Sequence, residues 1–443
     1  MASHDVLLDA ELNEERYIDL LTKLIGESEH VQNNPPKFVP QEDKVIQHLL
    51  EALRPYSTEN GGPLHVEHVT YVPGRGNLII KYMSEGAKGI VSFVGSHLDV
   101  VPANPETWDR NPFKLVREDD KLYGRGTTDC LGHVALITEL FIQLAEKKVQ
   151  LNTNMVAIFI ACEENSTIPD VGVDKLLKDG RLDELKGGPV YWVDSADSQP
   201  CVGTAAAIVW NLHAKGHLFH SGLPHNGINS FEFANEAVAY LQKRFYEDFP
   251  AHEKEDLYQF ATPSTMKPTQ VRIAEGSFNQ LPPWTKIIGD IRLTPFYNVE
   301  DVMSKIKTYV DELNATDFAA LPTRGPCSKY VVKSPEGEDI KGVLTLEFEG
   351  EPFKGIACDL ESDGHHMLRN ATKEVLGKAE PFSICGSLPL VGDLQEAGFD
   401  VQVCGYGHSS VYHGDNEYCS VSAMKNAIKI MSRVIHGFSS KYA

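Results

Sequence analysis

Acidic and imidazole side chains recur in this 443-residue sequence at the places where predicted buried strands end. His97 and Asp99 stand at the end of the apolar stretch IVSFVGSHLDVV, residues 90–101. The remaining members of the set are Asp129, Glu163, Glu164, Asp194 and His413. Imidazole and carboxylate donors in these proportions suit a pair of divalent, zinc-like ions.

His97 and Asp99 are separated by one residue, so on an extended chain both side chains point to the same face. A metal-ligating histidine usually donates its other ring N–H to a carboxylate or carbonyl, which fixes its orientation. The alternative is a hydrogen-bonded histidine in a core strand. The stretch alone does not separate the two interpretations, and the other strand-end residues favour the metal.

The adjacent pair Glu163–Glu164 adds a second inference. Neighbouring side chains at a strand end point in different directions, so one can bind an ion while the other acts as general base toward an activated water. His133 lies four residues after Asp129 on the same predicted helix face and is a competing ligand by spacing. We expect it to be an ordinary core or surface histidine.

The composition excludes several classes of protein. Hydrophobic residues make up 42% of the chain and charged residues 23%, as in soluble globular proteins. The formal charge of −21 disfavours binding to nucleic acid or an anionic membrane. No apolar run approaches the roughly 20 residues that span a bilayer. The N-terminal sequence resembles neither a signal nor a transit peptide, and the eight cysteines form no CxxC pair, so we expect a cytoplasmic protein with reduced thiols.

Two different orders of predicted strands and helices must position these residues. Strands are predicted at 65–71, 77–82, 90–96, 154–161, 189–194 and 400–404, and helices at 10–26, 42–54, 130–146, 172–184, 360–376 and 420–436. This alternation predicts an α/β fold with a mostly parallel sheet flanked by helices. Ligands of such sheets bind outside the carboxyl ends of the strands, where the set would converge.

The middle of the chain instead follows the order β-α-β-β-α-β, which is typical of a ferredoxin-like α+β domain. We therefore expect a small domain inserted into a larger one. The predicted division is 1–204 and 355–443 for the catalytic domain and 205–354 for an inserted lid or dimerisation domain.

Seven motifs make the sequence resemble the M20 metallopeptidase family. They are GSHLDVVP, the Trp/Pro/Phe loop that follows it, YGRGTTD, ACEEN, FHSGLPHNGINS, GSFNQLPPWTKIIGDIR and HGDNE, in that order between about residues 90 and 420. Within the family, the chain looks most like the acetylornithine deacetylases of eukaryotic type. The resemblance implies a zinc-exopeptidase-like catalytic domain that holds two divalent ions, with zinc expected first and cobalt or manganese as alternatives.

Carried over position by position, the resemblance implies metal ligands at His97, Asp129, Glu164, Asp194 and His413. Asp129 would bridge the two ions. We prefer Asp194 with His97 and Glu164 with His413, although the exchanged pairing stays open.

The resemblance also assigns the residues around the ions. Glu163 falls on the general base of the family, and Asp99 on the residue that orients the first histidine. The sequence departs from many relatives in reading DCLG from Asp129 onward and in ending a strand with VDSAD. The latter makes Asp197 an alternative to Asp194, which fits the strand end better.

Positions of the inserted domain complete the expected site. His220 matches a lid histidine that reaches the active site of a partner subunit, which implies a homodimer through this domain; a purely structural role is the alternative. Asn279 and Arg292 match positions that approach the substrate, although Arg292 could instead form an interdomain salt bridge. The turn Gly386–Ser387 resembles a loop that binds substrate through backbone groups.

The activity implied by this resemblance is hydrolysis of an N-acyl amino acid. N2-acetyl-L-ornithine, giving L-ornithine and acetate for arginine biosynthesis, is the expected small-molecule substrate. A general N-acyl-amino-acid hydrolase and a dipeptidase are the enzymatic alternatives. A non-enzymatic scaffold that kept the fold is the alternative from another class.

Overall fold

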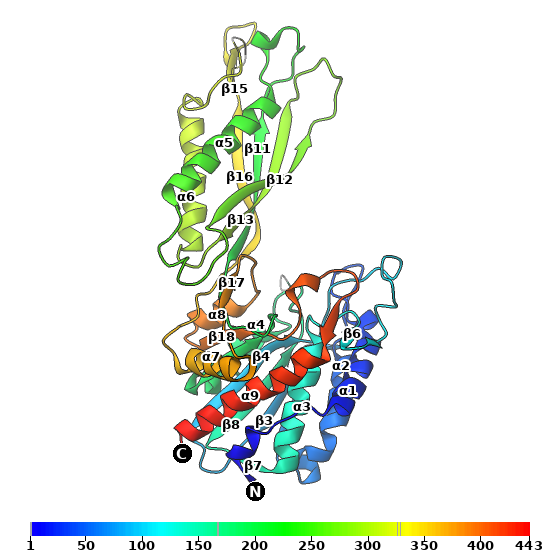
Figure 1. Ribbon diagram of the computed structural model, residues 1–443. Coiled ribbons are helices and arrows are strands. Elements are labelled where there is room, and N and C mark those ends of the chain that lie inside the picture. Colours follow the sequence, from blue (N-terminus) through cyan, green and yellow to red (C-terminus); the bar gives the residue numbers. More distant parts are fainter. Residues whose placement is uncertain (1, 166–167, 326, 328) are drawn as a thin grey trace. The chain divides into compact units, whose positions relative to one another are not determined.

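The computed structural model describes residues 2–165, 168–325, 327 and 329–443. The chain divides into two compact units (Figure 1). The first comprises Met1–Gly203, Cys358–Ser383 and Pro389–Ala443, and the second comprises Thr204–Ala357 and Ile384–Leu388. The division differs from the predicted one chiefly in the stretch Ile384–Leu388, which belongs with the second unit.

A large mixed sheet forms the centre of the first unit. Its eight described strands follow the order β17, β10, β18, β9, β4, β8, β3, β2. Their bounds are Phe382–Ile384, Cys201–Thr204, Asp400–Cys404, Pro189–Val193, Gly89–His97, Thr153–Ile160, Arg75–Tyr82 and Leu64–Val72. The four central strands β18, β9, β4 and β8 pair in parallel, as the alternation of strands and helices predicts. The edges are antiparallel, with β10 on β18 at one side and β3 and β2 at the other.

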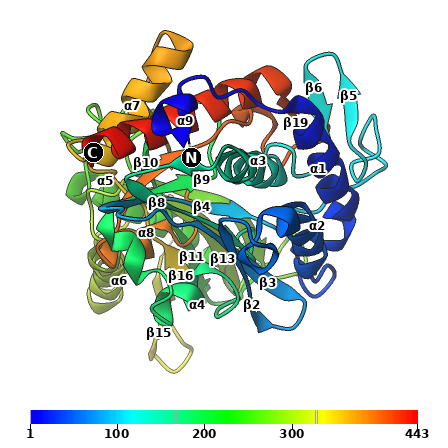
Figure 2. The same ribbon diagram turned by 90° about the horizontal axis from the view of Figure 1, so that it is seen from below.

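Helices cover both faces of this sheet, with α3 and α9 on one face and α4 on the other (Figure 2). Their bounds are α1 Glu14–Glu27, α2 Asp43–Leu53, α3 Leu131–Lys147, α4 Val173–Lys178, α7 Asp363–Leu376, α8 Val391–Glu396 and α9 Val421–Lys441. Helix α4 is shorter than the predicted 172–184 because Gly180 adopts a left-handed φ of 69° and ends the turn. Across the described residues, no helix combines the length and apolar character needed to span a membrane.

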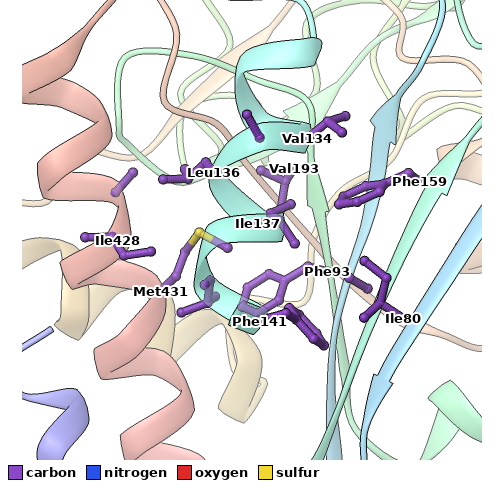
Figure 3. Packing of buried hydrophobic residues seen from close by; sticks show 14 of the residues in the cluster. Ile80, Phe93, Val134, Leu136, Ile137, Phe141, Phe159, Val193, Ile428 and Met431 are labelled. Atoms are coloured by element: carbon purple, nitrogen blue, oxygen red, sulfur yellow. The ribbon is translucent and has the colours of Figure 1, made fainter. Parts of the chain in front are cut away.

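Helix α3 is buried on every side, which explains its almost continuous apolar sequence. Val134, Ile137 and Phe141 face Phe93 of β4 and other side chains of the sheet, while Met431 of α9 packs on the opposite side (Figure 3). The helix is therefore held firmly in the core. Its N-terminal end, which follows Asp129, is fixed with it.

A small sheet outside the core joins two distant segments of the first unit. Strand β6 (Lys121–Tyr123) pairs antiparallel with both β5 (Val116–Glu118) and β19 (Tyr418–Ser420). It brings the end of the HGDNE motif beside the turn that leads to Asp129. None of these short strands is predicted by the sequence pattern.

The second unit has the predicted ferredoxin-like arrangement. Strands β12 (Thr265–Ile273), β13 (Trp284–Leu293), β11 (Ala206–Lys215) and β16 (Val343–Phe353) form an antiparallel sheet in that order. Helices α5 (Ser230–Asp248) and α6 (Val299–Ala315) lie along this sheet (Figure 1). Each helix begins at an asparagine, Asn229 or Asn298, whose side chain accepts backbone N–H groups of the first turn.

Candidate metal centre

The strand-end residues converge at the carboxyl edge of the parallel strands. His97 is the last residue of β4, Asp194 directly follows β9, and Glu163 and Glu164 lie in the loop after β8. Asp129 immediately precedes the cis-linked Cys130 at the start of α3. His413 comes from the loop between β18 and β19. All belong to the first unit.

Asp129 lies between the two histidines. Its Oδ1 is 2.8 Å from His97 Nε2, and its Oδ2 is 3.2 Å from His413 Nε2. Each carboxylate oxygen therefore faces a different imidazole. This is the arrangement that a carboxylate needs in order to share two ions.

Each histidine has one further carboxylate of its own. Asp194 Oδ1 lies 3.6 Å from His97 Nε2, and Glu164 Oε2 lies 3.2 Å from His413 Nε2. The shorter distances group Asp194 with His97 and Glu164 with His413, while the donor atoms of His97, Asp129 and Glu164 also lie within 4.8 Å of one another. Asp197, the alternative to Asp194, instead accepts the backbone N–H of Ser409 at 3.1 Å on the surface.

Glu163, the other glutamate of the pair, makes a longer contact with His97. Glu163 Oε2 is 3.9 Å from His97 Nε2, and the side chain is buried. Two sets of side chains have donor atoms close enough together to share an ion. One set is His97, Asp129 and Glu164, and the other is His97, Cys130 and Asp194. Glu163 thus lies beside the ligands, where it can exchange a proton with a molecule bound between them.

Asp99 holds the glutamate loop in place. Its Oδ1 accepts the N–H of Glu163 and its Oδ2 that of Glu164, each at 3.1 Å. The buried Asn33 donates to Oδ2 at 2.7 Å, a contact that sequence reasoning missed. The orienting acceptor of His97 Nδ1 is the backbone carbonyl of Asp99 at 2.8 Å, whereas the carboxylate lies 3.6 Å away.

The proton affinities on the His413 side reflect the excess of carboxylates. Hydrogen bonds to Asp129 and Glu164 raise the pKa of His413 to about 10. Burial, reinforced by the charge of Asp129, raises the pKa of Glu164 to about 7. Burial acts to raise the pKa of Asp129 also, but the two histidines outweigh it and keep that pKa below its usual range.

The His97 side behaves in the same way. Burial acts to lower the pKa of His97, but Asp194, Cys130 and Asp129 together outweigh it and the pKa lies well above its usual value. Burial raises the pKa of Asp194, and burial together with the charge of Asp194 raises that of Glu163 far more.

Three of the four carboxylates, Glu163, Glu164 and Asp194, thus have raised pKa values, as do both imidazoles, whereas the pKa of Asp129 stays low. Divalent cations would displace the protons held by the groups with raised pKa values and relieve the repulsion among the carboxylates. The nitrogen and oxygen donors fit zinc, cobalt or manganese. The donor set therefore fits two ions that share Asp129.

His133 is a core histidine, as expected. It is fully buried, its Nε2 accepts the N–H of Tyr406 at 2.8 Å, and burial lowers its pKa to about 4. The ring is neutral at physiological pH and takes no part in the cluster.

A further buried carboxylate was missed as a site residue. Glu417 Oε1 accepts the N–H groups of Thr128 and Asp129 at 2.8 and 3.0 Å. Glu417 is the last residue of the HGDNE motif, which served above only to recognise the family resemblance.

The predicted residues of the inserted domain lie in the second unit, in two groups. His220 pairs with Gln280 in an isolated bridge, and the neighbouring Ser221 donates its N–H to the carbonyl of Asn279 at 2.8 Å. In the other group, Arg292 donates to Asp290 at 2.7 Å and reaches Ser387 Oγ at 3.5 Å.

Gly386, the remaining predicted position, directly precedes Ser387 and so belongs to the group that contains Arg292. Its carbonyl accepts the N–H of Ala205 at 2.9 Å. This bond anchors the turn that carries Ser387.

Comparison with known proteins gives the family of the chain. The model of the peptidase family M20/M25/M40 matches residues 93–437. The chain is 54% identical to an acetylornithine deacetylase of Arabidopsis thaliana, over 96% of both chains. It is 52% identical to an acetylornithine deacetylase of Dictyostelium discoideum, over 96% of this chain and 97% of the relative.

Solved structures share the fold at low sequence identity. A dipeptidase of Saccharomyces cerevisiae superposes with a TM-score of 0.68 at 18% identity, covering 99% of this chain and 98% of that one. A dinuclear metal-binding M20 peptidase of Bacillus subtilis has a TM-score of 0.61 at 13% identity, covering 97% and 99%. The extent of the family match and the two full-length relatives lead to one conclusion: the chain belongs to the peptidase family M20/M25/M40.

Proposed function

We propose that this protein hydrolyses N2-acetyl-L-ornithine to L-ornithine and acetate. The observation that carries the proposal is the identity above 50% to two acetylornithine deacetylases over nearly the whole chain. The clustered carboxylates and histidines supply the groups that amide hydrolysis needs. The reaction would release ornithine for arginine biosynthesis.

Two divalent ions would be held by His97 and Asp194 on one side and by His413 and Glu164 on the other, with Asp129 shared. When bound, such ions polarise an acyl carbonyl and lower the pKa of water. Asp99 keeps the glutamate loop against this centre through its two backbone hydrogen bonds.

Glu163 is the proposed general base. Its buried carboxylate, ionised once bound cations offset the neighbouring carboxylates, would accept the proton of the attacking water and then deliver it to the leaving amine nitrogen. Water adds its oxygen to the acyl carbon, the C–N bond breaks, and the amine leaves protonated. The water-poor surroundings of Glu163 favour both transfers.

Residues of the second unit are proposed to bind the substrate. The guanidinium of Arg292, already held by Asp290, suits a substrate carboxylate. His220 would donate to the oxyanion as negative charge develops on the acyl oxygen. Asn279 and the Gly386–Ser387 turn would supply further polar contacts.

A substrate panel tests the proposed activity. Acetylornithine, N-acetylmethionine and a dipeptide are compared at equal concentration, with and without a chelator. We expect acetylornithine to be preferred and the chelator to abolish turnover. A clear preference for N-acetylmethionine or the dipeptide would assign the protein to an aminoacylase or dipeptidase activity instead.

Elemental analysis tests the metal content independently of activity. After loading with zinc, cobalt or manganese and removal of free ions, we expect two ions per chain. A protein that binds fewer than about one ion and turns over no substrate would be a scaffold. The metal that gives the highest turnover identifies the preferred one.

We further propose a cytoplasmic homodimer formed through the second unit. Strand β12 is an edge strand of its sheet, and its Val271 and Ile273 are 55% and 44% exposed. Exposed apolar edge strands favour pairing with another chain. Sedimentation should give a dimer mass that Val271→Lys reduces; a wild-type monomer would refute the dimer.

A further inference from the structure

The carboxylate of Glu417 is completely buried and is surrounded by donors. Besides the N–H groups of Thr128 and Asp129, its oxygens accept the N–H of Gly126 at 3.1 and 3.2 Å. One side chain thus satisfies three backbone donors of the turn that ends at Asp129. The position of the Asp129 backbone depends directly on this carboxylate.

Arg125 extends the same contact network to His413. Its Nη1 donates to Glu417 Oε2 at 2.6 Å, and its Nη2 lies 3.4 Å from the backbone carbonyl of His413. The guanidinium is almost fully buried and its carbon lies 5.2 Å from the ring centre of Trp108. The Arg125–Glu417 pair therefore contacts the backbones of both Asp129 and His413.

The two sides of the metal cluster differ in how they are supported. His97 and Asp194 stand at the ends of paired, buried strands. His413 comes from a loop, its side chain is 57% exposed, and its φ of 54° lies in the left-handed region. The His413 side needs support that the sheet does not supply.

We propose that the Arg125–Glu417 pair is a positioning device for the ion held by Asp129, Glu164 and His413. Loss of this pair weakens the binding of that ion more than the binding of the ion on the His97 side. The inference rests on the proposed two-ion centre and deepens it by naming residues that bind neither metal nor substrate. It also accounts for a buried ion pair beside the cluster.

Glu417→Gln is the informative substitution because it keeps the shape of the side chain. The amide nitrogen of glutamine must face either Arg125 or a backbone N–H, since donors surround both oxygens. At least one hydrogen bond is therefore lost and a buried guanidinium is left without its counter-charge.

The test is a metal titration of the metal-free, full-length protein with Co²⁺ in the presence of a competing chelator. Visible absorption of bound cobalt reports each ion without any assay of activity. We expect two binding steps in the wild type. In Glu417→Gln we expect one step to be kept and the other weakened about 10–100-fold, the usual effect of losing a residue that supports metal ligands.

Glu139→Gln is the matched control. Glu139, on α3, also has a buried carboxylate in the first unit. It accepts a hydrogen bond from Arg16 Nη2 at 2.8 Å. Its carboxylate accepts hydrogen bonds from Arg16 and Gln143, which belong neither to the metal cluster nor to the Arg125–Glu417 pair. The variant should keep both binding steps even if its melting temperature falls.

A double variant, Arg125→Met with Glu417→Gln, separates positioning from folding. Removing both charges abolishes the uncompensated guanidinium, so the melting temperature should recover toward that of the wild type. The weakened cobalt step should remain weak.

The outcomes are distinct. Two unchanged steps in Glu417→Gln, equal weakening of both steps, or the same change in Glu139→Gln would overturn the positioning role. A wild type that binds fewer than two cobalt ions would overturn the proposed centre and this inference with it. The deacetylase activity is then judged by the substrate panel alone.

Discussion

The adjacent glutamates allow the roles of base and ligand to be separated by one pair of matched substitutions. Glu163→Gln removes a proton acceptor while keeping the size of the side chain. The backbone N–H of residue 163 still binds Asp99, because that hydrogen bond does not involve the side chain. The loop should therefore keep its conformation.

The expected effect follows from the role of the carboxylate. Loss of a general base typically lowers the rate by about 10²–10⁴-fold, which corresponds to about 3–5 kcal/mol in the activation free energy. KM should change little, since Glu163 is proposed to move a proton and not to bind substrate. Both ions should stay bound, because the Glu163 carboxylate lies 3.9 Å from His97 Nε2, farther than the carboxylates of Asp129 and Asp194.

Glu164→Gln is the control at the next position. Its Oε2 faces His413 Nε2 at 3.2 Å, so this variant should lose affinity for one ion. The assay combines steady-state kinetics on acetylornithine with elemental analysis of the same samples. A purified wild type measured in parallel gives the reference for both quantities.

The reverse pattern would refute the assignment. If Glu163→Gln loses an ion while Glu164→Gln keeps both and loses turnover, the ligand and the base have been exchanged. Full activity in Glu163→Gln would exclude it as the base altogether.

Three further outcomes are expected. Asp99→Asn should lower turnover, and should lower metal affinity by about 10–100-fold, because the side-chain amide cannot accept the N–H groups of Glu163 and Glu164 together. Steady-state kinetics and cobalt titration measure the two effects, and an unchanged metal affinity would contradict the anchoring role of Asp99. Removal of metal by a chelator should lower the melting temperature, since ions at 100 times their Kd contribute about 2.7 kcal/mol per site; an unchanged melting curve would argue against the site. His133 has a pKa of about 4 against an ordinary 6.5, so the unfolded chain takes up its proton first and stability is lost as pH falls from 6.5 to 4. Urea titrations of metal-free protein measure the free energy of unfolding at each pH. Between pH 6.5 and 4, His133→Gln should lose up to about 3 kcal/mol less of this free energy than the wild type, and identical pH profiles of the two proteins would refute the buried neutral ring.

Much of the metal cluster could be predicted because one rule links strand ends to a common edge. Apolar runs mark the buried strands, and parallel strands bring their carboxyl ends together whatever the loops do. His97, Glu164 and Asp194 were accessible to this reasoning. Asp129 and His413, which precede predicted helices, were singled out with them, and the motifs of the family then implied their roles as ligands.

Other contacts depend on packing that no local pattern encodes. The sequence predicts Asp99 as the orienter of His97, whereas in the fold its carboxylate faces the glutamate loop and its carbonyl faces the imidazole. A two-residue spacing sets the side of the strand on which a side chain lies, but not which oxygen meets which donor. Asn33 reaches the same carboxylate from a segment 66 residues away.

Glu417 shows the difference most clearly. In the sequence it is one of many acidic residues in a strongly acidic chain, where an exposed, solvated carboxylate is the ordinary expectation. In the fold, the pairing of β19 with β6 brings it beneath the turn of Asp129, and three backbone N–H groups with Arg125 compensate its charge. The sequence by itself determined which donors the cluster contains, through residue types at strand ends and in the segments before predicted helices. Tertiary structure alone decided which buried groups hold those donors in place, because their partners come from distant segments that meet only when the chain packs.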